Sequence, residues 1–359
     1  ELTVTVSNIG NVALEVTDTA VTGTDTDQFS VNAPFTVAPE ESHELTVTFS
    51  PTSIGAKAAN LVLTHNAIGS PTVVPLTGEG LAEPGSFLFI ADSGLDAVFR
   101  VDPVTGNRTI ISDATTGTGP ALDFPFRIAV EPDGNLLVSN NGTGALIRID
   151  PLSGDRTVIA DAISGSGPGS SFGNGVVVGR AGRIFVVESS IDALIEIDAV
   201  SGVRTVISDA STGSGPTFPL PTQLALDEDG DFYIVDTALD AIIRVDSDSG
   251  DRTLISDAST GTGDIFQSIK NISVETDGSI LAVDFSVVPL VRGVIRVDPT
   301  NGNRTVVSND VTGTGPSFGT PGSVLAEAGG DIILSDKTQG VFRVDPVSGD
   351  RTILSDTPT

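Results

Sequence analysis

Short runs of alternating hydrophobic and polar residues follow one another along the chain, and turn-forming residues separate them. The first 80 residues contain runs such as "ELTVTVSN", "HELTVTFSP" and "ANLVLTHN", and none of these has the apolar spacing of a helix. Several short strands at this spacing indicate a β-sandwich, because each strand buries one face and exposes the other. We therefore expect residues 1–80 to form one β-sandwich domain.

From residue 81 to residue 359 the pattern repeats. An Arg-Thr pair returns at successive spacings of 48, 48, 48, 52 and 47 residues. Each unit holds four strand-like runs in a fixed order, as in "RIAVEP", "NLLVSN", "ALIRID" and "RTVIAD". Four short antiparallel strands in 40 to 50 residues are typical of one β-propeller blade. The chain is therefore expected to be all-β, with a six-bladed β-propeller after the sandwich.

The most regular part of each unit is a hairpin, "VDPVTGNRT" in the first. Its aspartate ends a strand, its proline fixes φ, and its glycine supplies the positive φ of the turn. Asp102 and Arg108 flank this hairpin closely enough to be expected to pair across it. A blade needs such a hairpin in every unit, whereas a catalytic apparatus rarely needs six copies, so we interpret these residues as structural. They include Asp102, Gly106, Arg108, Asp150, Gly154, Arg156, Arg204, Arg252, Arg304 and Arg351.

The two ends of the repeat region are irregular. In the first unit, "GEGLAE" stands where the last unit has its innermost strand "GSVLAE", and the chain ends at "SDTPT" where the other units continue into "GTGP". A strand exchanged between the termini would close a propeller ring, and the sequence leaves open whether that happens here. We expect the blade beside this junction to be incomplete.

Two resemblances arise from these residues. The stretch from "LTVTVSNIGN" to "GAKAANLVLTHN" resembles the immunoglobulin-like repeats of the ASPM/SPD-2/Hydin type, which are common in exported bacterial proteins. Runs such as "AVEPDGNLLVSN" and "ALDEDGDFYIVD" resemble NHL-type propellers. The ASPM/SPD-2/Hydin-type repeats usually begin with a further strand before the position of Leu2. The absence of that strand here implies an open sheet edge at Leu2, Val4 and Val6. Such an edge is a template on which another chain can add a strand.

Charge narrows the possible partners. The chain has 47 acidic and 18 basic residues, a net charge of -29, and such a surface repels phosphate backbones and anionic membranes. We therefore expect no nucleic-acid partner, and cations are plausible counter-species. No apolar run is long enough for a transmembrane segment, and the absence of cysteine rules out disulfides and thiolate chemistry. The acidic, lysine-poor composition suits an extracellular or cell-surface setting, and the resemblance implies a secreted bacterial protein.

In each of the six units, one acidic or amide side chain stands at the end of the second strand. These six side chains are candidates for ligand binding at the channel mouth. Their oxygen atoms suit calcium or magnesium, but each could instead hydrogen-bond its own loop. They are Asp92, Asn140, Glu188, Asp236, Asp284 and Asp336.

Two local clusters are candidate calcium sites, although neither has the distal glutamate of a complete calcium loop. The first is "DEDGD", with Asp227, Asp229 and Asp231, and the second is "DSDSGD", with Asp246, Asp248 and Asp251. Calcium is therefore the one cofactor that the sequence suggests. Solvated turns are the alternative interpretation of both clusters.

Catalytic function is not expected from the side chains available. Both histidines, His43 and His65, lie in the sandwich region, and general acid–base catalysis at neutral pH most often uses histidine. We expect a non-catalytic module for adhesion, ligand binding or assembly, whose partners are proteins or copies of itself. One form of this would be a subunit of an extracellular fibre. The alternative is a calcium-dependent hydrolase or lyase that acts at the channel mouth.

Overall fold

The structure, a computed structural model, describes residues 2–32, 34–50, 55–80, 87–169, 171–287, 290–327 and 329–356. The chain divides into two compact units, Glu1–Ser86 and Phe87–Thr359, whereas the sequence placed the division between residues 80 and 81. Its described residues form strands and two short 3-10 helices, η1 (Thr26–Gln28) and η2 (Arg180–Gly182). Among the described residues, no helix has the length and apolar character needed to cross a membrane.

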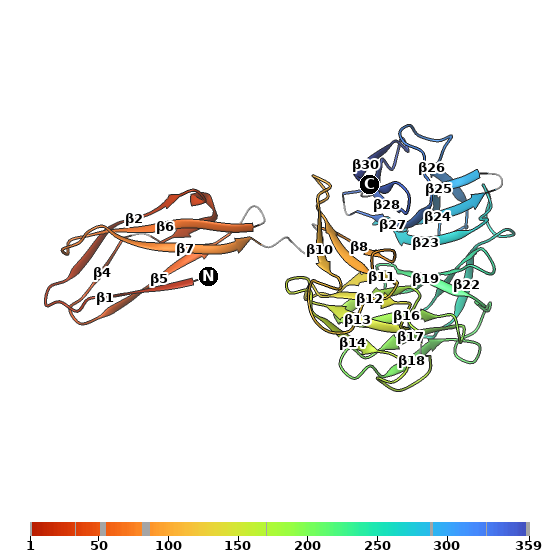
Figure 1. The fold of residues 1–359 in the computed structure, drawn as a ribbon, viewed down its shortest axis with the longest axis horizontal. Coiled ribbons are helices and arrows are strands. Elements are labelled where there is room, and N and C mark those ends of the chain that lie inside the picture. Colours follow the sequence, from red (N-terminus) through yellow and green to blue (C-terminus); the bar gives the residue numbers. More distant parts are fainter. Residues whose placement is uncertain are drawn as a thin grey trace. The chain divides into compact units, whose positions relative to one another are not determined.

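The first unit is a sandwich of two antiparallel sheets, as the sequence predicts (Figure 1). Their orders are β1-β5-β3 and β4-β2-β6-β7. Side chains from both sheets fill the space between them, including Val16, Val47 and Leu61. The strands are β1 (Leu2–Ser7), β2 (Leu14–Gly23), β3 (Phe29–Val31), β4 (Phe35–Val37), β5 (Ser42–Phe49), β6 (Gly55–His65) and β7 (Thr72–Gly80).

The second unit is a β-propeller, whose antiparallel sheets are arranged around a common centre (Figure 1). It contains six sheets, and in the described residues the first has three strands and the others have four. The first three sheets are β8 (Leu88–Asp92), β9 (Ala97–Val101), β10 (Arg108–Ser112); β11 (Pro125–Val130), β12 (Leu136–Asn140), β13 (Ala145–Ile149), β14 (Arg156–Ala160); β15 (Val176–Val178), β16 (Ile184–Glu188), β17 (Ala193–Ile197), β18 (Arg204–Ser208). The other three are β19 (Pro221–Leu226), β20 (Phe232–Asp236), β21 (Ala241–Val245), β22 (Arg252–Ser256); β23 (Ile269–Val274), β24 (Ile280–Val287), β25 (Leu290–Val297), β26 (Arg304–Ser308); β27 (Pro321–Ala326), β28 (Ile332–Asp336), β29 (Gly340–Val344), β30 (Arg351–Asp356).

Both faces of a blade are buried, because each sheet packs against the next. Phe185 and Val187 of β16, for example, share a core cluster with Phe232 and Ile234 of β20 in the following blade. The rings of Phe185 and Phe232 meet edge to face with centroids 4.8 Å apart, a favourable arrangement for aromatic pairs. The middle strands therefore read as almost continuous apolar runs.

The repeated arginines connect each blade to the preceding one. Arg252 is 7% exposed. Its Nε donates to Pro216 O at 2.6 Å and its Nη1 donates to Ser208 Oγ at 2.7 Å, and both acceptors lie about forty residues earlier in the chain. The guanidinium also lies over the Phe218 ring, 5.5 Å from the centroid. We call this arrangement the arginine clamp, and it is formed by Arg156, Arg252, Arg304 and Arg351. Arg204 takes part through its Nη atoms alone, because Ala160 stands where the other blades have serine and the Arg204 Nε has no partner among the described residues.

The glycine-rich segments between blades fit closely against the hairpins. At Gly213, φ is +78°, and a Cβ atom there would lie 1.9 Å from Gly250 O of the next hairpin. The neighbouring Ser214 donates from both its backbone N and its Oγ to Asp251 Oδ1. These segments are therefore links between blades.

The first hairpin differs from the expectation. Asp102 Oδ1 accepts the backbone N–H groups of Val104 and Thr105 at 2.8 Å, so this carboxylate caps its own turn. Arg108 pairs instead with Asp356 of the last blade at 3.6 Å. The expected pairing of Asp102 with Arg108 is wrong, because the turn supplies closer donors to the aspartate.

The last blade meets the first at a junction that we call the seam, formed by Ser355 and Asp356 on one side and Gly106 and Arg108 on the other. Ser355 Oγ donates to Gly106 O at 2.8 Å across the seam. Ser256 Oγ makes the same bond to Gly302 O between two consecutive blades. The ring thus closes with a contact that the other junctions also use.

The innermost strand expected at "GEGLAE" falls half outside the described residues. Gly78, Glu79 and Gly80 end β7 of the sandwich, paired with the start of β6, and residues 81–86 lie outside the described residues. The described first blade is therefore the sheet β10-β9-β8.

Candidate functional site

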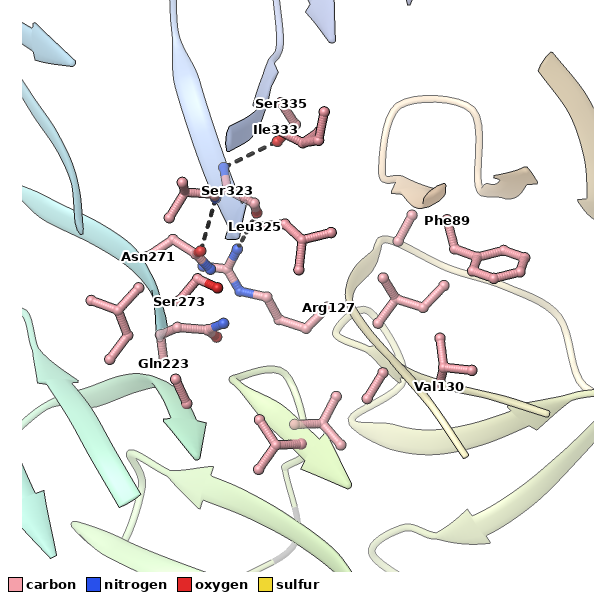
Figure 2. Close-up of a pocket in the computed structure, with 18 of the residues that line it drawn as sticks. Phe89, Arg127, Val130, Gln223, Asn271, Ser273, Ser323, Leu325, Ile333 and Ser335 are labelled. Atoms are coloured by element: carbon pink, nitrogen blue, oxygen red, sulfur yellow. Dashed lines mark hydrogen bonds between the residues drawn. The ribbon is translucent and has the colours of Figure 1, made fainter. Parts of the chain in front are cut away.

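A cavity of about 550 Å³ lies at the centre of the propeller, between the innermost strands of the blades. Most of its wall is apolar, with side chains such as Phe89, Val130 and Leu325 (Figure 2). On the side of the first blade the wall is β8, because the described part of that blade has no strand nearer the centre.

Polar side chains lie in the cavity wall at one level. They stand at the same register position of the innermost strands: Arg127 opposite Ser139, Gln223 opposite Val235, Asn271 opposite Val283, and Ser323 opposite Ser335. We call Arg127, Gln223, Asn271 and Ser323 the polar belt. All four line the same cavity (Figure 2).

Arg127 reaches across the channel to the blades on the far side. Its Nη1 donates to Ser323 Oγ at 3.1 Å, its Nη2 donates to Lys270 O at 3.3 Å, and its guanidinium carbon lies 4.3 Å from the centroid of the Phe126 ring. Burial lowers the pKa of Arg127 to about 10, so the side chain is still protonated at neutral pH. It places one positive charge at the centre of the propeller.

Hydrogen bonding in the belt is incomplete. Asn271 Oδ1 accepts the Val324 N–H at 3.0 Å, which holds two neighbouring blades together. In contrast, Arg127 Nε and Gln223 Oε1 are buried and have no hydrogen-bond partner. Buried polar atoms without partners are rare in proteins, and a bound molecule is one way to satisfy them.

The six predicted channel-mouth residues lie elsewhere, at the loops that follow the second strands, and none is among the described residues that line the cavity. Asp236 is typical: it is fully buried, Oδ1 accepts the N–H groups of Ala238 and Leu239, and Oδ2 accepts the Leu220 N–H. The others make similar bonds to nearby loops, and they are Asp92, Asn140, Glu188, Asp284 and Asp336. Burial raises the pKa of Asp284, although backbone N–H groups oppose this.

The two predicted calcium clusters also hydrogen-bond within their turns. In the first, Asp227 Oδ1 accepts the N–H groups of Asp229 and Asp231, and Asp231 forms an ion pair with Arg244. In the second, Asp246 caps the turn that contains Asp248, at 3.1 Å from its N–H, while Asp251 binds the preceding link. Across the described residues, no three His, Cys, Asp or Glu side chains gather as they would around a metal ion.

The predicted assembly edge coincides with β1. This strand pairs with β5 on one side and ends its sheet, so its other backbone edge is open in the described sheet. Val4 and Val6 point toward the sandwich core, and Leu2 begins the strand. Any added strand would therefore bind to backbone groups of β1 and not to these side chains.

The belt itself was missed from the sequence. The available signal was Arg127, a charge within the otherwise apolar "RIAV" run, at a position where the third unit has Gly175 and the fourth and fifth units have other polar residues, in "TQLAL" and "KNISV". A departure of this kind from the repeat marks a position whose role differs between blades.

The comparisons with known proteins support both parts of the fold. Residues 1–73 match the family described as abnormal spindle-like microcephaly-associated, ASPM-SPD-2-Hydin. No curated protein sequence is significantly similar to the chain.

Among solved structures, the chain is similar to a protein in a nidogen/laminin complex, with 16% identity over 74% of this chain and 91% of that chain and a TM-score of 0.55. It is also similar to a gluconolactonase from Xanthomonas campestris, with 16% identity, 77% and 86% coverage, and a TM-score of 0.54. A virginiamycin B lyase from Staphylococcus aureus follows, with 15% identity, 78% and 83% coverage, and a TM-score of 0.50. At these identities the likeness concerns the fold alone.

These neighbours correct the expectation that the chain is not an enzyme. That expectation was based on the lack of histidine in the propeller, yet solved structures with the same fold include a gluconolactonase and a lyase. One fold hosts many activities, and function depends on the site that the fold carries. The fold therefore gives no ground for denying the propeller catalysis.

Proposed function

We propose that the propeller binds a small, largely apolar molecule in its central cavity. The observation that carries this proposal is the cavity of about 550 Å³, lined by the innermost strands and containing buried polar atoms without partners. Ligand pockets commonly have volumes of 300 to 1,000 Å³, with mainly apolar walls and a few polar groups that orient the ligand. The cavity and its belt match that description.

We also propose that the chain is a module of a secreted or cell-surface protein with a six-bladed, NHL-type propeller. The six sheets and the recurring Asp-Gly turns before their second strands support the blade assignment. The net charge of -29 supports an extracellular setting, because a strongly charged surface keeps a protein soluble in a salty medium.

The binding proposal is tested with N-phenyl-1-naphthylamine, a neutral apolar dye whose fluorescence rises when it leaves water. The chain has no tryptophan to interfere with this signal. We expect saturable binding of one dye per chain. Ala129→Phe places a large ring in the cavity wall and should abolish binding, whereas Ala162→Phe, on the exposed surface, should not. Equal binding by both variants would show that the cavity is not the site.

A second candidate function, self-assembly or adhesion to another protein, is favoured by the open edge of β1. Backbone N–H and C=O groups at such an edge can pair with a strand of another chain. One structural neighbour is a component of a nidogen/laminin complex, which shows that this fold occurs in a protein assembly.

Light scattering after size-exclusion chromatography tests this candidate, in calcium and again in chelator. We expect species larger than 36.6 kDa. Thr3→Lys and Thr5→Lys, at exposed positions of β1, should reduce them because charges on an edge strand oppose pairing. A monomer under both conditions would refute assembly, and a loss of mass on chelation would show that calcium takes part.

A further inference from the structure

The central cavity has one charged side chain among its described lining residues, and it is basic. This is unexpected in a chain with 47 acidic and 18 basic residues. The described residues include no carboxylate that forms an ion pair with Arg127, although Arg148 and Arg296 pair with Glu131 and Glu275 at 2.5 Å. A charge removed from water is costly unless it is paired. Arg127 therefore has no carboxylate partner in the described part of the chain. The clamp arginines also lack one there, but each of them donates to several backbone carbonyls of a link.

The guanidinium also has unused hydrogen-bonding capacity. An arginine carries five N–H donors in a planar fork. Arg127 uses Nη1 on Ser323 Oγ and Nη2 on Lys270 O, and its Nε is buried with no acceptor. The edge of the guanidinium that includes Nε is the edge on which a carboxylate binds with two parallel hydrogen bonds. This donor lies within a wall that otherwise consists mainly of Phe, Ile, Leu, Val and Ala side chains.

These observations narrow the ligand class, provided that the cavity is a ligand site as proposed above. We propose that the ligand is a small organic carboxylate with an apolar body. Its carboxylate would bind Arg127 and its body would lie against the innermost strands. A single cation in an apolar wall suits one negative charge, whereas a phosphate group usually needs several donors and charges.

Gln223 adds a possible second contact. Its Oε1 is buried without a donor, and it lines the same cavity as Arg127. The oxygen and nitrogen of a glutamine amide can exchange places by a flip, so this side chain can present either an acceptor or a donor. A hydroxyl or amide group on the ligand would satisfy it in one of these orientations.

The test compares octanoate with octan-1-ol as competitors of N-phenyl-1-naphthylamine. The two molecules have chains of equal length and differ in the carboxylate. We expect octanoate to displace the dye at a concentration at least tenfold lower than octan-1-ol, a difference equal to about 1.4 kcal/mol. Arg127→Gln should remove this preference. Arg183→Gln should preserve it, because Arg183 is an exposed arginine that pairs with Glu196 on the surface.

The outcomes separate this inference from the proposed function. If the dye binds and octan-1-ol displaces it as well as octanoate does, or if neither displaces it, the carboxylate class is wrong and the cavity remains a ligand site. If the dye does not bind, the proposed function is refuted, and this inference is refuted with it because it rests on the cavity being a ligand site. Arg127→Lys keeps a charge without the planar fork and should retain only part of the preference.

If neither Arg127 variant folds, the melting temperature of the wild-type protein gives a second measurement. Octanoate should raise it more than octan-1-ol at equal concentration, because a ligand stabilises the folded state according to its affinity. An equal shift would overturn the inference.

Discussion

The arginine clamp allows a comparison between two arginines that occupy the same place in the repeat. Arg252 is 7% exposed and donates four hydrogen bonds to the preceding blade, at 2.6, 2.7, 2.7 and 3.0 Å. Arg108 has a partly exposed side chain and a 3.6 Å ion pair with Asp356, which is 82% exposed. Replacing either arginine by alanine removes one positive charge, so the change in net charge is the same.

The expected losses of stability differ several-fold. Arg252→Ala leaves the carbonyls of Asp209 and Pro216 without this donor, whereas Thr212 O keeps the Asp209 N–H, and each buried unsatisfied group costs about 1–3 kcal/mol. Water that enters the space left by the side chain recovers part of this, so we expect a loss of about 4 kcal/mol in the free energy of unfolding. Arg108→Ala should cost less than about 1 kcal/mol, as is usual for an exposed ion pair.

The assay is urea unfolding followed by tyrosine fluorescence. The chain has one tyrosine and no tryptophan, and Tyr233 is buried in β20, so the signal reports on the propeller and not on the sandwich. A shift of the midpoint at constant slope measures the change in stability. Equal losses for the two variants, or a loss below 1 kcal/mol for Arg252→Ala, would refute the clamp as a major source of stability.

Two further predictions concern the links and the acidic turns. Gly213→Ala should destabilise the propeller by more than about 3 kcal/mol in the same assay, because the new Cβ would lie 1.9 Å from Gly250 O. Gly230→Ala is the control: φ is +98° there but no atom lies within 4 Å of the new Cβ, so it should cost about 1 kcal/mol. Backbone hydrogen bonds within the turn lower the pKa of Asp102 below 3.8, and twelve other propeller aspartates have lowered pKa values. Their stabilisation is complete above pH 3.8 and is lost as the pH falls through the folded-state values, so the urea midpoint should drop below about pH 4. Asp284, whose pKa is raised by burial, acts in the opposite direction, and Asp284→Asn should make the drop steeper.

The repeat explains why most of the fold could be predicted from the sequence. Strand alternation and turns such as Asp102 to Gly106 act over a few residues, so local patterns are enough to place the strands and hairpins. The contacts of Arg252 could not be predicted in this way, because Ser208 lies in the preceding blade and Pro216 in the link that follows that blade. Position in the repeat shows that the arginine recurs but not what it contacts.

The candidate site was harder to predict for the same reason. Arg127 and Ser323 lie 196 residues apart and come together only when the ring closes. The acidic residues that did attract attention, such as Asp236, are abundant because turns need them. The proposed ligand contact, Arg127, instead stands at a position where the blades differ, and a search for what the units share passes over it.

The clamp also bears on how such a chain can change in evolution. Each clamp arginine binds only the end of the blade before it and the link that follows that blade, so these contacts are made between neighbours along the chain. Duplication or deletion of one whole unit would therefore leave the remaining junctions intact and alter only the diameter of the ring and the fit at the seam. The two hydrogen-bonding partners there, Ser355 and Gly106, are the same pair of residue types that joins other blades. Such a protein could change the size of its central cavity by gene duplication first and adjust the lining residues afterwards.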